Sequence, residues 1–145
     1  MSAFTELRAG DAVFTASFAV ERADLVAYAE ASGDHNPIHL DEAAARAAGL
    51  PDVIAHGMYT MGLVSRAVLE WAAEAGLDAE FGEFSSRFAK PVVVPAEGGA
   101  VVEIEAKVRK AGADSVELAI TVLSAGEKVL APARVTLVAN RPHTA

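Results

Sequence analysis

The sequence predicts an α+β fold in which an antiparallel β-sheet wraps around one long helix. Apolar residues cover most of the circumference of the stretch from Gly57 to about Ala75, which is typical of a buried helix. After Gly76 the hydrophobic period changes to two, which is typical of β-strands. A sheet wrapped around a single helix hides the apolar residues of both elements. The other face of the sheet would still need cover, so we expect a partner subunit.

The first half of the chain predicts one strand and two short helices before the long helix. Residues 13–20 are rich in residues that favour strands. Residues 24–32 place apolar side chains on one helical face, and Gly33 is suited to end that helix. Asp41 can cap a short alanine-rich helix that ends near Gly49.

The second half predicts a run of antiparallel strands joined by tight turns. Alternating apolar residues and turn signals place these strands at residues 81–94, 102–108, 116–122 and 129–138. Pro91 and Pro95 indicate a bend, a bulge or an end in the first of them.

Composition limits the class of protein. The chain of 145 residues predicts a single domain, 1–145, and 52% hydrophobic residues exclude disorder. The absence of cysteine excludes disulfides, thiolate metal sites and a cysteine nucleophile. A net charge of −8 repels nucleic acid and anionic lipid, so we expect neither as a partner. The N-terminal residues lack a signal-peptide pattern and charged residues interrupt the long helix, so we expect a cytoplasmic protein without membrane association.

The segment 32–39 concentrates polar side chains where Pro37 stiffens the chain. Asp34 and His39 can point into one pocket from the two sides of this turn and hold one water, and such a pair can move protons near neutral pH. Alternatively, Asp34 only caps a turn after the helix. A metal site of His35, His39 and Asp41 is a third option, but the spacing is not diagnostic.

The segment 54–58 lies where the long helix begins. Backbone N–H groups without a partner and the positive end of the helix dipole meet there. Gly57 would let a substrate approach the backbone and have its carbonyl polarised, or it only eases the junction. His56 could be a structural hydrogen bonder. Ser65, two turns further on, could face the pocket or bond back to a helix carbonyl.

Two of these segments resemble one family. The sequences YAEASGDHNPIH, at 28–39, and IAHGM, at 54–58, strongly resemble the MaoC-like (R)-specific enoyl thioester hydratases. The short length and the segment 84–92 look most like the catalytic B-type subunit of the (3R)-hydroxyacyl-ACP dehydratases. The resemblance covers nearly the whole chain and favours the acid–base interpretation of Asp34 and His39.

The resemblance implies a hot-dog fold, whose subunits pair into a continuous sheet, and a role for each matching residue. Asp34 and His39 occupy the two catalytic positions, and Asn36 supports the motif. Gly57 would bind the thioester oxygen through its backbone N–H. His56 and Ser65 are expected to support the site, Ser65 at a serine position used in some hydratases.

The implied reaction is the reversible hydration of trans-2-enoyl thioesters of CoA or ACP to (3R)-hydroxyacyl thioesters, with no metal or organic cofactor. The expected partner is a second copy or a related hot-dog subunit. Two rival functions remain. A hot-dog thioesterase would use a carboxylate elsewhere, usually on the central helix, and a non-catalytic acyl-binding subunit would lack one member of the pair. The presence of both Asp34 and His39 argues against each.

Overall fold

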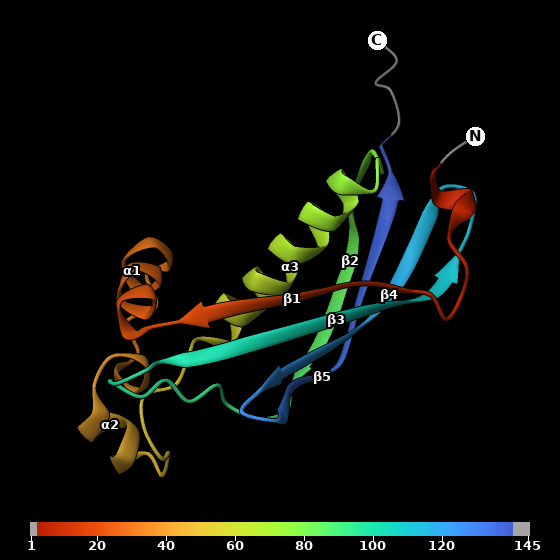
Figure 1. The fold of residues 1–145 in the computed structure, drawn as a ribbon. Helices are drawn as coiled ribbons and strands as arrows, with labels where there is room; N and C mark the ends of the chain where they lie inside the picture. The colour runs from red at the N-terminus through yellow and green to blue at the C-terminus, as the bar shows by residue number, and fades with distance from the viewer. Residues whose placement is uncertain (1–2, 141–145) are drawn as a thin grey trace.

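A computed structural model describes residues 3–140, so the predicted domain, 1–145, extends outside the described residues at both ends. The predicted α+β architecture is confirmed: an antiparallel sheet of five strands curves around the long helix α3 (Figure 1). In chain order, the elements are η1 (Ala3–Glu6), β1 (Ala12–Val20), α1 (Arg22–Ser32), η2 (Pro37–His39), α2 (Glu42–Ala47), α3 (Gly57–Glu74), β2 (Ala79–Phe88), β3 (Ala100–Ala111), β4 (Ser115–Ser124) and β5 (Glu127–Ala139).

The sheet has the strand order β1-β3-β4-β5-β2. Hairpins join β3 to β4 and β4 to β5, and the second turn uses Ala125 and Gly126 at positive φ. The alternating pattern that predicted these strands fixes which face each residue takes, because successive side chains point to opposite sides of a sheet. On β3 the buried side chains are those of Val102, Ile104, Ala106 and Val108.

The outer face of the sheet corrects the expectation that it needs a partner to cover it. The intervening residues of β3 include Glu103, Glu105 and Lys107, which are exposed. Arg109 on β3 forms an ion pair with Glu117 on β4, with 2.6 Å between Nη1 and Oε2. Charged side chains of this kind are stable in water, and antiparallel sheets commonly have one solvated face. A partner would therefore have to bind elsewhere.

The long helix is buried on one side only, although the sequence predicts a helix that is buried nearly all round. Its inward face consists of the buried Thr60 and of five residues that pack in the core, Leu63, Val64, Ala67, Val68 and Ala72. On the other side Met58 is 60% exposed and Leu69 is 44% exposed. The physical reason is the topology: the sheet covers only one side of α3 (Figure 1).

The first predicted strand of the second half, 81–94, is interrupted. β2 ends at Phe88, Ala89 still donates its N–H to Val129 of β5, and residues 92–94 then pair with the segment before α3. The N–H of Ala55 donates to the carbonyl of Val92 at 2.9 Å, and the N–H of Val94 donates to the carbonyl of Val53 at 2.8 Å. Proline at 91 lacks an N–H for the ladder, which agrees with the predicted bend. We call residues 92–94 the crossing strand, and their hydrogen bonds hold in place the residues that lead into α3.

Arg22 ties the helices on this side of the molecule together. Its guanidinium lies 2.7 Å from a carboxylate oxygen of Glu42 on α2 and 2.7 Å from one of Asp52, and it also donates to the carbonyl of Val94 at 3.0 Å. The start of α1, the start of α2 and the crossing strand are thereby fixed relative to one another.

Among residues 3–140, no helix is long and apolar enough to cross a membrane.

Candidate active site

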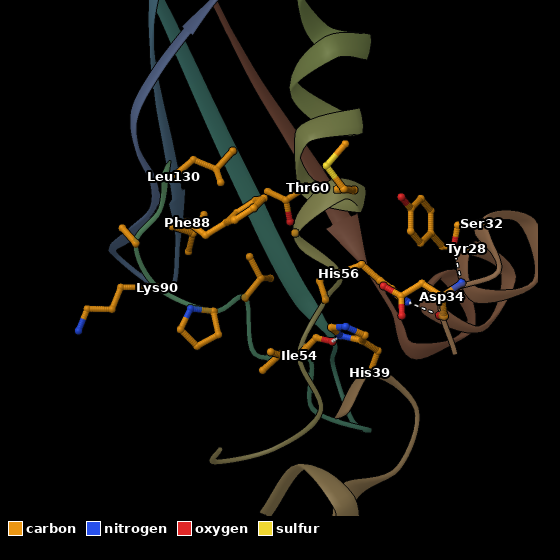
Figure 2. A pocket seen from close by; sticks show the side chains of 17 residues that line it. Tyr28, Ser32, Asp34, His39, Ile54, His56, Thr60, Phe88, Lys90 and Leu130 are labelled. Carbon is orange, nitrogen blue, oxygen red and sulfur yellow. Dashed lines mark hydrogen bonds between the residues drawn. The ribbon is translucent and has the colours of Figure 1, made fainter. Parts of the chain in front are cut away.

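A cavity of about 560 Å³ lies where the end of α1, the 33–39 loop, the start of α3 and the end of β2 meet. Its lining divides into two sides. Figure 2 shows Tyr28, Ser32 and Asp34 on one side, Phe88, Lys90 and Leu130 on the other, and His56 and Thr60 between them. The structure thus brings both motif segments to one cavity, together with residues of β2 and β5 that are remote in sequence.

Asp34 reaches the cavity because the helix before it stops abruptly. Gly33 ends α1 at φ 80°, a left-handed conformation that glycine adopts without strain, and its N–H donates to the carbonyl of Ala29 at 2.9 Å. The carboxylate of Asp34 accepts the N–H of Asn36 at 3.2 Å, and the side chain of Asn36 accepts the N–H of Ile38 at 3.3 Å. Asp34 therefore caps the turn after α1, as one of the two interpretations of the sequence expects, and it also lines the cavity. Asn36 shapes the loop from outside the lining.

His39 presents an unprotonated nitrogen in its neutral form. The side chain is 8% exposed, and its Nδ1 lies 2.7 Å from the carbonyl oxygen of Ile54. Because a carbonyl only accepts, Nδ1 carries the hydrogen and Nε2 keeps its lone pair. Burial lowers the pKa of His39 below 6.5 and the neighbouring His56 lowers it further, against the opposing effects of the Ile54 bond and Asp34. This lowered pKa favours the neutral form of His39 at neutral pH, with the lone pair of Nε2 able to accept a proton.

His56 connects the two motif segments. It is 2% exposed, and its Nε2 donates to the backbone carbonyl of Asp34 at 3.1 Å. Its ring stacks on that of His39, with 3.9 Å between ring centroids and 25° between planes, and packs against Tyr28 at 4.7 Å. Within the described part of the chain, the buried Nδ1 of His56 meets no hydrogen-bond partner. His56 acts here as a structural hydrogen bonder, one of the alternatives that the sequence left open.

A metal ion fits this group poorly. Asp34, His39 and His56 each offer a ligand atom, and these atoms lie within 4.8 Å of one another. However, the two imidazole planes are stacked, so the in-plane lone pairs of the two rings lie in nearly parallel planes and do not converge on one point. The structure also does not bring together His35, His39 and Asp41, the metal site considered from the sequence. Asp41 instead caps α2 by accepting the N–H of Ala43 at 3.0 Å, and His35 is exposed outside the cavity.

Gly57 is the first residue of α3, and no hydrogen-bond acceptor for its N–H is found among residues 3–140. An added Cβ at Gly57 would lie 2.6 Å from the Phe88 ring. Ser65 is not brought to the cavity: its hydroxyl donates to the carbonyl of Met61 at 3.0 Å, the alternative noted from the sequence.

Sequence reasoning missed several lining residues, among them Tyr28, Thr60 and Phe88. Thr60 and Phe88 gave no signal, because the period of an element does not say which residue borders a cavity. Tyr28 did give one, since it lies one helical turn before Ser32 on the same face of α1, and both line the cavity.

The five-stranded antiparallel sheet curved around α3, with Asp34, His39 and Gly57 lining one cavity, defines a hot-dog protein with a cleft at the start of its long helix. A family model described as MaoC like domain matches residues 6–126, and the chain belongs to this family.

Individual relatives support the same assignment. A stretch of 78 residues is 47% identical to a 3-hydroxyacyl-thioester dehydratase X of Mycobacterium tuberculosis, covering 52% of this chain and 25% of that protein. A solved MaoC-like dehydratase is 33% identical with a TM-score of 0.88, covering 96% of this chain and 42% of that one. The unliganded R-hydratase PhaJ1 from Pseudomonas aeruginosa is 28% identical with a TM-score of 0.79, covering 96% of this chain and 86% of that one. The predicted hot-dog fold is thereby confirmed. The chain spans about a quarter of the length of the first of these relatives.

Proposed function

We propose that this chain is an (R)-specific enoyl thioester hydratase, a hydro-lyase that reversibly hydrates trans-2-enoyl thioesters of CoA or ACP to (3R)-hydroxyacyl thioesters. The observation that carries the proposal is a single cavity lined by the carboxylate of Asp34, the buried His39 and the first residue of α3, Gly57. The named dehydratases and R-hydratases among its relatives support the same reaction.

The proposed mechanism uses one water held between Asp34 and His39. As the water oxygen bonds to C3, one of the two groups takes a proton from it, and the electron pair of the C2–C3 double bond moves toward the thioester oxygen. The N–H of Gly57 stabilises the negative charge on that oxygen. A proton is then delivered to C2, which restores the thioester carbonyl. The pair shares the acid and base roles, because coupled groups do not divide them cleanly. No cofactor is required for this step.

The rival functions fit the cavity less well. The residues of α3 that line it are Gly57, Met58 and Thr60, and none is a carboxylate. The acidic residues of the helix, Glu70 and Glu74, lie toward its other end. A thioesterase would thus lack its expected carboxylate on this part of the described chain. A non-catalytic acyl-binding subunit would not need the complete Asp34 and His39 pair.

Crotonyl-CoA separates these functions. A hydratase should remove the enoyl thioester absorbance of crotonyl-CoA without releasing free thiol, and the product should be (3R)-hydroxybutyryl-CoA. Release of free CoA would instead identify a thioesterase. Unchanged absorbance with saturable binding of crotonyl-CoA would identify an acyl-binding subunit. Either of these results would contradict the proposal.

The pH dependence of hydration follows from the environment of His39. Its pKa is lowered from 6.5, so its neutral form persists to lower pH than that of an ordinary histidine. We expect the acid limb of kcat/KM to lie below pH 6.5, because protonation of Nε2 removes a member of the pair. Crotonyl-CoA hydration measured from about pH 5 to about pH 8, where histidine titrates, checks this. A histidine-dependent limb above pH 6.5 would contradict it.

We further propose a B-type catalytic subunit, formed by one domain over 1–145, that works as a dimer with itself or with a related hot-dog subunit. The ChsH1-ChsH2 complex and the HadBC dehydratase complex of Mycobacterium tuberculosis contain similar folds, with TM-scores of 0.78 and 0.70. A cytoplasmic location remains a prediction from the sequence, which cell fractionation would test.

Dimer formation is expected from the surfaces left uncovered in the single chain. Among residues 3–140, β1 and β2 are the edge strands of the sheet, and the exposed side of α3 carries Met58 and Leu69. Free edges and adjacent apolar side chains favour pairing with another subunit. Light scattering of the purified chain, alone and mixed with a candidate partner subunit, should give the mass of a dimer. An active monomer at micromolar concentration would contradict this expectation.

A further inference from the structure

Thr60 is a buried polar residue of α3 that the mechanism above does not use. The residue is 1% exposed and lines the cavity. Among residues 3–140, no hydrogen-bond partner is found for its hydroxyl. Burying a hydroxyl without a hydrogen bond is unfavourable, because the group loses its contact with water. The hydroxyl is therefore available to an atom that enters the cavity.

The backbone of α3 explains why this hydroxyl is free. A hydroxyl inside a helix ordinarily bonds back to the carbonyl one turn earlier. Ser65 does so, with 3.0 Å between its Oγ and the carbonyl oxygen of Met61. The equivalent carbonyl for Thr60 is that of His56, which already accepts the N–H of Tyr59 at 3.1 Å and the N–H of Thr60 at 3.2 Å. Both lone pairs of this carbonyl oxygen are thus taken.

Thr60 lies one helical turn after Gly57. Residues three apart on a helix are neighbours on its surface, and both of these border the cavity. Side chains of a helix tilt toward its N-terminus, so the side chain of Thr60 leans back toward the turn that contains Gly57. Figure 2 shows Thr60 on the side of α3 that faces the Phe88 ring, and this ring lies beside Gly57. The hydroxyl of Thr60 and the N–H of Gly57 are therefore placed to serve one ligand atom.

We propose that Thr60 is a second hydrogen-bond donor to the thioester oxygen, an inference that rests on the proposed hydratase function. Negative charge develops on this oxygen as water adds to C3, and the oxygen has lone pairs for two donors. The N–H of Gly57 supplies one hydrogen bond and the hydroxyl of Thr60 supplies the other. Thr60 thus stabilises charge, and proton transfer stays with Asp34 and His39.

Kinetics with crotonyl-CoA separate the hydroxyl from the shape of the residue. Thr60→Val replaces the hydroxyl by a methyl group of similar size, and valine is readily buried. We expect kcat of Thr60→Val, and of Thr60→Ala, to fall by about 10²-fold, the cost of losing one oxyanion donor. Thr60→Ser keeps the donor and should turn over at nearly the wild-type rate. The matched control, Thr136→Val, makes the same exchange on β5 outside the cavity and should leave kcat unchanged.

Infrared spectroscopy of a bound thioester measures the hydrogen bonds to its oxygen directly. Butyryl-CoA, isotopically labelled at its carbonyl carbon, lacks the C2–C3 double bond and is not hydrated. A donor to the carbonyl oxygen lowers the stretching frequency of the carbonyl. The band of bound butyryl-CoA should therefore move to higher frequency in Thr60→Val and stay in place in Thr60→Ser. A loss of packing alone would not separate these two variants in this way.

The outcomes are distinguishable. A slow Thr60→Val variant with a higher carbonyl frequency, together with an active Thr60→Ser variant, supports the proposal. An active wild type with unchanged kcat in Thr60→Val overturns the role of Thr60 alone. A slow Thr60→Val variant with an unchanged carbonyl frequency also overturns it, because the hydroxyl would then act on the water. Equal losses in the Val and Ser variants would trace the effect to packing and overturn it too. A folded wild type that neither hydrates crotonyl-CoA nor binds butyryl-CoA overturns the proposed function and this inference together.

Discussion

Replacing Asp34 by Asn, or His39 by Ala, should lower kcat for crotonyl-CoA hydration by about 10²–10⁴-fold, the usual contribution of a positioned acid or base. Asparagine keeps an oxygen that can accept the N–H of Asn36, so the 33–39 loop should keep its shape while the charge is lost. His39→Ala removes the imidazole and its bond to the carbonyl of Ile54. Steady-state kinetics with purified variants of matched melting temperature measure the effect.

The loop supplies a matched control. His35 lies in the same segment but is exposed and outside the cavity, so His35→Ala should retain nearly full turnover. The double variant Asp34→Asn/His39→Ala should be little worse than the worse single variant, because both groups act on one water. Near-normal turnover by a folded Asp34→Asn variant would rule out the proposed mechanism.

The second large effect concerns the backbone N–H of Gly57. Gly57→Pro deletes this donor, and loss of one oxyanion donor costs about 10²–10³ in kcat. Proline is suited to the first position of a helix. His56 before it has φ −60° and ψ 136°, the extended conformation that a residue before proline prefers. The obstacle to any side chain at position 57 is the Phe88 ring.

Phe88→Ala therefore provides the background in which the N–H can be tested by itself. Gly57→Ala/Phe88→Ala and Gly57→Pro/Phe88→Ala both add a Cβ, but only the second lacks the N–H. We expect the proline double variant to turn over about 10²-fold more slowly than the alanine double variant at similar melting temperature. In the wild-type background, the turnover of Gly57→Ala should lie between that of the wild type and that of Gly57→Pro. Equal rates for the two double variants would show that another group holds the thioester oxygen.

Much of the fold could be predicted because it depends on periodicity. The alternation of β3 and β4 fixes which residues enter the core, and the first residue of α3 was located from Gly57 and the apolar run after it. The outer face of the sheet was misjudged for a different reason. Its charged residues were visible in the same alternation, as at Glu103 and Glu105, but the single helix was expected to leave an apolar face uncovered.

The candidate site was predictable where a local motif carries it. Gly33 and Pro37 force the turn that presents Asp34 and His39, so their proximity follows from a few residues of chain. Ser65 was ambiguous because a hydroxyl on a helix can bond to the preceding turn, and only the structure shows that it does. Because Ser65 lies outside the cavity lining, its position does not support the role in the site that the resemblance implied.

The sequence by itself determined the α+β class, the long helix, the hairpins and the two motif segments, because each depends on residues that are near one another in the chain. Only the tertiary structure decided what surrounds them. His56 stacks on His39 and donates a hydrogen bond to the carbonyl of Asp34, 22 positions away in the sequence. Phe88, at the end of β2, packs against Gly57 at the start of α3. The pairing of residues 92–94 with the segment before α3 makes these contacts possible. Contacts of this kind depend on strand register and packing, which hydrophobic periodicity does not encode.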